Sequence, residues 1–216
     1  MFCQICGNFS DAIVCPVCKE ILENAAFAHR YASHCLTCGY PIADAVYTCS
    51  NCSQGLLSYG RYIPPLSTLL GRYKFSCEKS LAKVLVPLYQ SLLIHLKNPV
   101  LVPVPASKKG LHDRGFDQMA YLCKSLESMH DYPVLSLLKA RGKGEQKFLS
   151  REQRKLRAGY KVIKNKKSLV ESYAKKGYSF VLIDDISTTG RTLEVCADML
   201  LEAYGIKPQA IVLALA

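Results

Sequence analysis

The chain has 216 residues, half of them hydrophobic, and a formal net charge of +11. This length suits one ordinary domain with a small appendage, and this composition argues against a largely disordered chain. The longest apolar stretch, residues 81–96, is interrupted by polar and charged side chains and does not predict a membrane span. Because Cys3 and Cys6 precede any apolar segment typical of a secretory signal, we expect a soluble, cytoplasmic protein without membrane insertion.

The positive charge is concentrated in one segment. Residues 138–167 contain twelve Lys and Arg against two acids, a balance of +10, whereas residues 1–58 contain two bases and four acids. Charge this local indicates an anionic partner at one place rather than a contribution to general solubility.

Eight of the eleven cysteines fall in the first 52 residues, as four Cys-x-x-Cys pairs. Two thiolates three residues apart can face one tetrahedral Zn²⁺, and two such pairs complete its coordination. Disulfides are the competing explanation, but the cysteines are spaced as zinc knuckles and no secretory signal accompanies them. The sequence therefore predicts two structural zinc ions, with these ligands: Cys3, Cys6, Cys15, Cys18, Cys35, Cys38, Cys49 and Cys52.

The spacing alone leaves the combination of the four pairs open. Sixteen residues separate Cys18 from Cys35, which also fits a zinc site built from the middle two pairs. However, residues 3–18 (C-Q-I-C-G then C-P-V-C) are echoed by residues 35–52 (C-L-T-C-G then C-S-N-C), and this repetition favours two sequential ribbons. We expect residues 1–56 to form this double zinc ribbon, with a structural role and an outer face open to docking.

Residues 57–216 predict an α/β domain. A linker around residues 55–65 is followed by helices, predicted from apolar residues at helical spacing, at 66–75, 78–96, 113–129 and 191–204. Apolar runs predict strands at 100–105, 132–138, 179–185 and 209–216. Alternation of strands with helices indicates a parallel sheet with right-handed crossovers. Three cysteines isolated in apolar patterns should be buried packing residues: Cys77, Cys123 and Cys196.

The turn that follows the strand at 100–105 is basic. Lys108 and Arg114 come at that strand's carboxyl end, where they could meet a pyrophosphate, and arginine suits bidentate phosphate binding. A solvated basic turn is the plainer interpretation. Lys74, within Arg-Tyr-Lys-Phe, could approach the same anion or could be an exposed helix lysine.

Residues 141–147, with two glycines and no apolar anchor, predict a mobile basic loop. Such loops close over phosphorylated substrates and supply cations to a departing pyrophosphate. A nucleic-acid backbone would use the same charges, with Phe148 and Tyr160 as stacking faces for bases, and the two roles are compatible. The candidate nucleic-acid contacts are Arg141, Lys143, Lys147, Arg151, Arg154, Lys155 and Arg157.

The most informative segment runs from Tyr178 to Leu193. A buried strand ends in Asp184 and Asp185, and a hydroxyl-rich turn then opens a helix. Free backbone N–H groups at a helix start bind anions, and carboxylates bind sugar hydroxyls, so together they predict a site for a phosphorylated sugar. The alternative is that the acidic pair only caps the helix. The candidate binding residues are Asp184, Asp185, Ser187, Thr188, Thr189, Gly190, Arg191 and Thr192.

This segment resembles the ribose-phosphate motif of type I phosphoribosyltransferases, which is an apolar strand, two acids and a Thr-Gly-x-Thr loop. The resemblance implies that Asp184 and Asp185 hold the ribose hydroxyls of phosphoribosyl pyrophosphate (PRPP), as catalytic residues if the site turns over. It implies that residues 188–192 hold the 5′-phosphate and that Mg²⁺ accompanies the ligand.

Nearly the whole chain resembles the ComF/GntX family, whose transformation members are called ComFC. The shared features are the double zinc ribbon, Tyr-Lys-Phe (73–75), Val-Pro-Val-Pro (102–105), Arg-Gly-Phe-Asp-Gln (114–118), residues 146–149, Arg154 and the Asp-Asp-x-x-Thr-Thr-Gly loop. Two features depart from the family. Asp117 replaces the usual Asn, and an Asn expected three residues after Arg154 is missing through a short deletion.

The resemblance implies a phosphoribosyltransferase-like domain and a cytoplasmic role in natural transformation. Such a protein handles incoming single-stranded DNA, together with a ComFA-like translocase or helicase or a recombination mediator, and binds PRPP and Mg²⁺ without an established transferase reaction. The rival hypothesis is a working phosphoribosyltransferase, in which a base nitrogen attacks C1′ as pyrophosphate leaves. A third is that PRPP acts only as an effector of DNA affinity.

Overall fold

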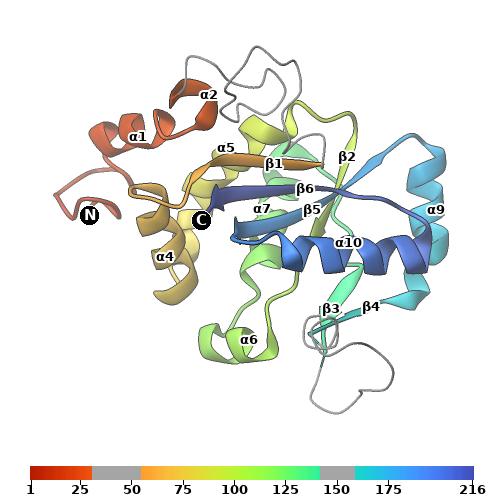
Figure 1. Cartoon of the computed structure of the whole chain (residues 1–216). Coiled ribbons are helices and arrows are strands. Elements are labelled where there is room, and N and C mark those ends of the chain that lie inside the picture. The colour runs from red at the N-terminus through yellow and green to blue at the C-terminus, as the bar shows by residue number, and fades with distance from the viewer. Residues whose placement is uncertain (31–54, 142–158) are drawn as a thin grey trace. The chain divides into compact units, whose positions relative to one another are not determined.

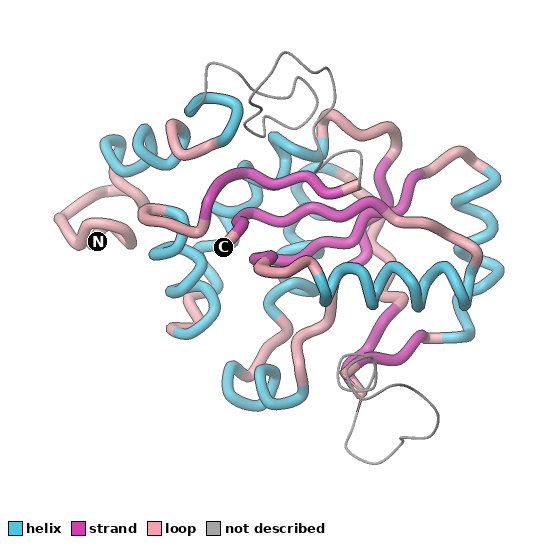
Figure 2. Tube along the Cα trace, viewed as in Figure 1, coloured by secondary structure: helices cyan, strands magenta, loops and turns pink. Residues whose placement is uncertain are grey.

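The structure is a computed structural model that describes residues 1–30, 55–141 and 159–216 (Figures 1 and 2). The chain divides into two compact units. The first comprises Met1–His95, Asp185–Ser187 and Ile211–Ala216, and the second comprises Leu96–Asp184 and Thr188–Ala210. The predicted boundary between residues 56 and 57 stays a prediction, because residues 31–54 lie outside the described part of the chain.

The first unit contains the first four cysteines and the elements α1 (Pro16–Glu23), α2 (Phe27–Arg30), β1 (Leu56–Arg61), α4 (Leu66–Phe75), the 3₁₀ turn η1 (Lys79–Leu81) and α5 (Ala82–Leu93). Helix α4 has the bounds that its sequence pattern predicts. Leu66, Leu69, Leu70 and Tyr73 recur on one face and are at most 1% exposed. Burial of such a side chain contributes roughly 1.5–3 kcal/mol, so this face fixes α4 within its unit.

Strand β1 lies where the sequence predicts a linker, so that prediction is wrong for residues 56–61. Two prolines and two glycines in residues 55–65 suggest a loop. The strand forms because it pairs with β6, a partner so remote in sequence that a local pattern does not reveal it. The Tyr62 N–H, just after the strand, donates to the Leu215 carbonyl over 2.8 Å. Gly60 passes so close to Ala25 that an added Cβ would lie 2.7 Å from the Ala25 carbonyl oxygen. This glycine therefore serves the close approach of two backbones rather than a turn.

The second unit contains β2 (Pro99–Pro103), α6 (Lys108–Arg114), α7 (Gln118–His130), β3 (Leu138–Ala140), β4 (Tyr160–Val162), the 3₁₀ turn η2 (Lys164–Lys166), α9 (Lys167–Lys175) and α10 (Arg191–Tyr204). Strands β5 (Ser179–Ser187) and β6 (Gln209–Leu215) contribute residues to both units. The predicted helix over residues 113–129 is two helices, because Gly115 adopts a left-handed φ of 70° that ends α6.

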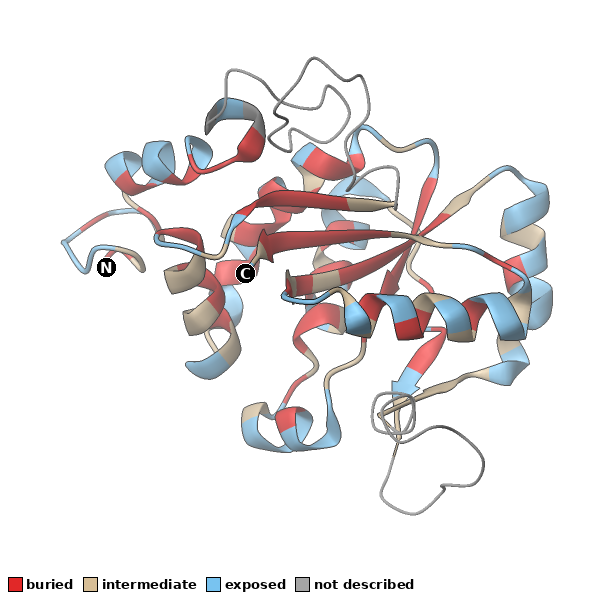
Figure 3. Ribbon diagram, viewed as in Figure 1, coloured by how far each residue is buried: buried red, intermediate tan, exposed pale blue. Residues whose placement is uncertain are grey.

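Four of the described strands form one parallel sheet in the order β1-β6-β5-β2, which confirms the α/β fold class. In β2 and β5, Val100 lies opposite Phe180 and Pro103 lies opposite Ile183. The core of both strands is buried, as expected for a parallel sheet covered on both faces (Figure 3). The Val104 N–H continues the pairing by donating to the Ile183 carbonyl over 3.0 Å. The end of β2 is thereby fixed next to the residue that precedes the acidic pair.

The predicted strand over residues 132–138 is wrong. The Leu101 N–H donates to the Pro133 carbonyl and the Leu135 N–H donates to the Leu101 carbonyl, both over 2.8 Å, so only one bridge forms beside β2. Proline has no N–H with which to extend this ladder. In this region a regular strand begins only at Leu138, in β3, which pairs antiparallel with β4. Among the described residues, no helix combines the length and the apolar character needed to cross a bilayer.

Candidate functional site

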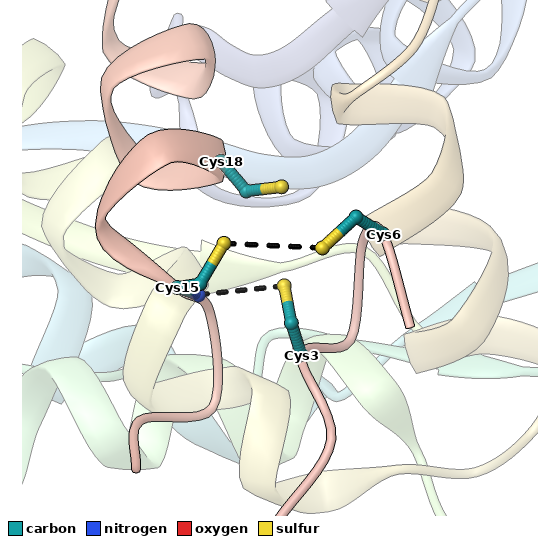
Figure 4. A group of neighbouring side chains, drawn as sticks. All are labelled: Cys3, Cys6, Cys15 and Cys18. Atoms are coloured by element: carbon teal, nitrogen blue, oxygen red, sulfur yellow. Dashed lines mark hydrogen bonds between the residues drawn. The ribbon is translucent and has the colours of Figure 1, made fainter. Parts of the chain in front are cut away.

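The first four cysteines gather into one cluster (Figure 4). The sulfur atoms of Cys3, Cys6, Cys15 and Cys18 all lie within 4.8 Å of one another, and those of Cys6 and Cys15 are 3.9 Å apart. A zinc–sulfur bond of ~2.3 Å gives a tetrahedron with edges of ~3.8 Å. The donor set therefore fits one zinc ion, and four thiolates leave no position for a substrate. This centre has a structural role.

Local backbone geometry builds the cluster. Gly7 has a left-handed φ of 76° and its N–H donates to the Cys3 carbonyl over 3.0 Å, which closes the first knuckle. Cys15 precedes the first residue of α1, Pro16, and the first turn of that helix carries Cys18. This local geometry brings the first two pairs together, which supports the sequential combination over a site built from the middle two pairs.

The environment of the sulfur atoms favours a bound cation. Burial would raise the pKa of the Cys3 thiol, but backbone N–H groups of Cys15, Cys6 and Ile5 lower that pKa to about 6. Two of these donors, the N–H groups of Cys15 and Ile5, lie 3.3 Å and 3.4 Å from the sulfur. Burial, together with the neighbouring sulfur atoms, raises the pKa of Cys18 to about 12. A divalent cation bound by all four sulfur atoms would stabilise each of them as a thiolate and would offset half of their negative charge. The ligands predicted for a second zinc lie outside the described residues: Cys35, Cys38, Cys49 and Cys52.

The acidic pair lies within β5 rather than at its carboxyl end, because the strand continues to Ser187. Asp184 is half-buried, whereas Asp185 is only 4% exposed. Lys74, on the last turn of α4, places its Nζ atom 3.2 Å from Oδ2 and 3.4 Å from Oδ1 of Asp185. The interpretation of Lys74 as an exposed helix lysine is therefore wrong. A cation at this position offsets the cost of burying a carboxylate.

The loop that joins β5 to α10 has the backbone expected at a helix start. Gly190 adopts a left-handed φ of 71°, and its carbonyl accepts the Glu194 N–H over 3.0 Å. The Arg191 N–H lies 3.5 Å from the Thr189 hydroxyl oxygen. Within residues 188–192, the first two threonines are exposed. Their hydroxyls are open to solvent, beside the N–H groups of the first helical turn.

The two basic residues predicted to meet a pyrophosphate differ in position. Lys108 is exposed at the start of α6, a helix capped by the Ser107 hydroxyl, which accepts the Gly110 N–H over 3.0 Å. Arg114 folds back over its own helix, so that a Cβ added to Gly110 would lie 2.2 Å from Nη2 of Arg114. The buried Nε of Arg114 has no hydrogen-bond partner among the described residues.

Asp117, which stands where the resembling family usually has Asn, accepts hydrogen bonds from two segments of the chain. Its Oδ1 atom accepts the N–H groups of Met119 and Ala120 over 3.1 Å and 3.0 Å, which caps α7. Its Oδ2 atom accepts the Ala106 N–H over 2.9 Å. An asparagine in the same orientation would offer only one acceptor and would turn an amide donor toward that N–H. The chain thus uses both oxygens of a carboxylate at this position.

Tyr160 lies near Asp184, a position that the sequence did not predict for it. Burial raises its pKa, and the nearby charges of Cys196, Asp184 and Asp117 add to the effect. The same combination of burial and the Asp184 charge raises the pKa of Cys196 to about 12. The sequence shows only a tyrosine within a basic segment. Its proximity to Asp184 arises from the tertiary structure, through the position of β4.

Of the predicted nucleic-acid contacts, Arg141 alone is described. It is half-buried, and its N–H donates to the Gly159 carbonyl over 2.8 Å, next to the β3–β4 pair. The others lie outside the described residues: Lys143, Lys147, Arg151, Arg154, Lys155 and Arg157.

The prediction that the three isolated cysteines are buried is confirmed for two of them and wrong for the third. Cys123 and Cys196 are fully buried, as expected. Cys77 is half-buried and follows α4 with a left-handed φ of 56°, so its prediction as a buried helical residue is wrong.

Comparison with known proteins finds similarity over most of the chain. Residues 1–19 match the four-cysteine zinc finger domain of RecR. Competence protein F of Haemophilus influenzae is 31% identical over 203 residues, which cover 87% of this chain and 83% of that protein. The DNA utilization protein YhgH of Escherichia coli K12 is 29% identical, with 87% and 84% covered. Competence protein ComFC of Bacillus subtilis is 27% identical over 209 residues, with 89% and 79% covered.

Proposed function

This chain belongs to the ComF family of competence and DNA utilization proteins, and on that premise we propose that it handles incoming single-stranded DNA in the cytoplasm during natural transformation. The observation that carries the proposal is the similarity to competence proteins over 87% of the chain. A ComFA-like translocase or a recombination mediator is the proposed protein partner. A second structural zinc ion, on the later cysteines, belongs to the same proposal.

The charge distribution supports a nucleic-acid partner. Residues 138–167 carry a balance of +10, and in the β3–β4 pair Lys139 lies directly opposite Lys161. Like charges at opposing positions of an antiparallel pair are destabilising unless a counter-charge is present. DNA phosphates would supply that counter-charge, and release of their counterions would drive binding.

We further propose that the segment from β5 to α10 binds PRPP with Mg²⁺. Asp184 and Asp185 would accept hydrogen bonds from the ribose hydroxyls, and Ser187 together with residues 188–192 would bind the 5′-phosphate. Lys108 and Arg114 would approach the pyrophosphate. Bound Mg²⁺ would neutralise part of the pyrophosphate charge. The half-buried Asp184, the left-handed Gly190 and the two exposed threonines support this assignment.

Calorimetry tests the PRPP site. The double variant Asp184→Asn/Asp185→Asn should lose PRPP binding while it keeps the zinc content of the native protein. Asp198→Asn, which removes an exposed acid of α10, is the matched control and should bind PRPP normally. Undiminished affinity in the double variant would refute the site.

Salt dependence tests the DNA surface. Affinity for single-stranded DNA should fall with salt at a log–log slope of roughly −0.7 per phosphate contacted. Replacing Arg151, Arg154, Lys155 and Arg157 by Gln should flatten that slope, whereas replacing Lys175 and Lys176, which lie outside the basic segment, should not. An unchanged slope in the first variant would place the DNA elsewhere.

A second candidate function is phosphoribosyl transfer, which the acidic pair favours. The C1′–O bond to pyrophosphate would break with its electron pair leaving on the pyrophosphate, while a base nitrogen forms the C1′–N bond and loses its proton to solvent. An assay for PRPP consumption with mixed nucleobases, run with and without single-stranded DNA, separates the functions. Consumption supports the transferase, whereas a PRPP-dependent change in DNA affinity without consumption supports PRPP as an effector.

A further inference from the structure

A hydrogen bond joins the zinc cluster to helix α4. Gln4 lies between the ligands Cys3 and Cys6, and its Oε1 atom accepts from Nη1 of Arg72 over 2.5 Å. The other end of the same amide, Nε2, donates to the Phe2 carbonyl over 3.4 Å, which sets the orientation of the amide. Gln4, the residue that Arg72 contacts, therefore belongs to the zinc knuckle, because zinc ligands precede and follow it in the sequence.

Arg72 has a second partner at the end of its own helix. Its Nη1 atom lies 3.9 Å from Oε1 of Glu78, and the two side chains are 40% and 29% exposed. An ion pair this exposed contributes little to the free energy of unfolding by itself. With the charge-assisted bond to Gln4, however, it holds the last turn of α4 between the zinc knuckle and the segment that follows the helix.

Lys74 leaves the same helical turn in another direction. Residues two apart on a helix are separated by about 200°, so Arg72 and Lys74 project from nearly opposite sides of α4. Between them Tyr73, 1% exposed, packs into the core and prevents the helix from rotating. One side of the turn therefore contacts the zinc knuckle, and the other contacts Asp185 of the acidic pair.

We propose that Gln4 and Arg72 are positioning residues, which hold Lys74 on Asp185 and thereby link zinc occupancy to PRPP binding. The inference rests on the proposed PRPP site. The contacts that carry it lie within the first unit, in three segments that are far apart in sequence: residues 3–6, 72–78 and 185.

The direction of the link follows from charge. With zinc bound, the knuckle holds Gln4 against Arg72, the end of α4 is ordered, and the Lys74 ammonium neutralises Asp185. Without zinc, α4 loses this contact, its last turn frays, and the ammonium is no longer fixed beside the carboxylate. An anionic ligand then meets more negative charge. Zinc should therefore strengthen PRPP binding, and by thermodynamic reciprocity PRPP should slow the loss of zinc.

The test measures zinc release from the full-length, zinc-loaded protein to an excess of chelator, with and without saturating PRPP and Mg²⁺. For the native protein we expect PRPP to slow one phase of release about five- to tenfold, the lower end of typical couplings between sites. Asp184→Asn/Asp185→Asn controls for zinc binding by PRPP itself, and its release rate should not respond.

Matched substitutions separate positioning from general stability. Gln4→Met and Arg72→Met should keep their zinc but lose the response to PRPP. Gln4→Glu, which preserves an acceptor for Arg72, should retain it. A native protein that binds PRPP in calorimetry but releases zinc at an unchanged rate overturns the inference and leaves the proposed function intact.

A second measurement does not depend on PRPP. Acylation of Lys74, followed by peptide mass spectrometry, should be severalfold slower in the zinc-loaded native protein than in zinc-loaded Arg72→Met, because the ion pair with Asp185 protects the amine. If calorimetry detects no PRPP binding, the proposed PRPP site is refuted, and this labelling then decides the positioning role. Equal labelling rates in the two proteins would overturn it.

Discussion

Replacing Lys74 by Met should destabilise the protein because it leaves Asp185 as a buried carboxylate without this cation. Asp185 is 4% exposed, and Lys74 lies within 3.2 Å and 3.4 Å of its two oxygens. Removing one partner of a fully buried ion pair costs about 3–5 kcal/mol. The Lys74 side chain is 28% exposed, so water screens part of the interaction, and we expect a loss of about 2 kcal/mol.

The assay is denaturant unfolding of the zinc-loaded protein at neutral pH, combined with a double-mutant cycle. Lys74→Met/Asp185→Asn should be more stable than Lys74→Met alone, because the neutral amide needs no cation. The coupling energy between the two sites should be about 1 kcal/mol or more. If Lys74→Met unfolds within roughly 0.5 kcal/mol of the native protein, the effect of an ordinary surface substitution, or if the two changes are additive, the argument about the buried carboxylate is refuted.

Three further substitutions test individual contacts. Asp117→Asn should cost about 1–3 kcal/mol in denaturant unfolding, because one backbone N–H in the turn after β2 loses its acceptor; an unchanged midpoint would contradict the paired acceptor role. Gly60→Ala should cost about 1–3 kcal/mol, since the new Cβ would lie 2.7 Å from the Ala25 carbonyl oxygen; full stability would mean that β1 shifts freely. Burial, with a contribution from the Glu23 charge, raises the pKa of Tyr59 to about 12. An unfolded tyrosine ionises near pH ~10, so this burial destabilises only the ionised form: unfolding free energy is unaffected below that pH and falls as the pH rises from ~10 toward 12. Tyr59→Phe should make the alkaline fall in unfolding free energy shallower, and an unchanged pH profile would count against the burial argument.

The sequence predicted those elements whose patterns are local and strongly periodic. Helices α4 and α10 have the predicted bounds, because apolar residues at a period of 3.6 leave little choice of buried face. Strand β6 agrees within one residue. Strand β1 was missed because its pairing with β6 joins residues about 150 positions apart, and a short segment that contains a glycine carries little intrinsic strand preference.

The same distinction between local patterns and remote contacts applies to the candidate site. The ligands of the zinc centre could be identified from sequence because two Cys-x-x-Cys knuckles need only local turns to present four sulfur atoms. The acidic pair was identifiable because it directly follows the apolar run 180–183 in the sequence, and run and pair belong to the same strand, β5. The proximity of Tyr160 to Asp184 was not identifiable, since nothing local to β4 specifies what it packs against.

The amino-acid sequence by itself determined the α/β class and the first zinc centre, because both rest on local patterns along the chain, and similarity over 87% of the chain shows its membership of a competence-protein family. Tertiary structure alone decided that Lys74 pairs with Asp185, 111 residues away, and that Arg72 contacts the zinc knuckle. Such contacts depend on how helix α4 packs, and a charge on an amphipathic helix can find its partner only after the apolar face has fixed the orientation of that helix.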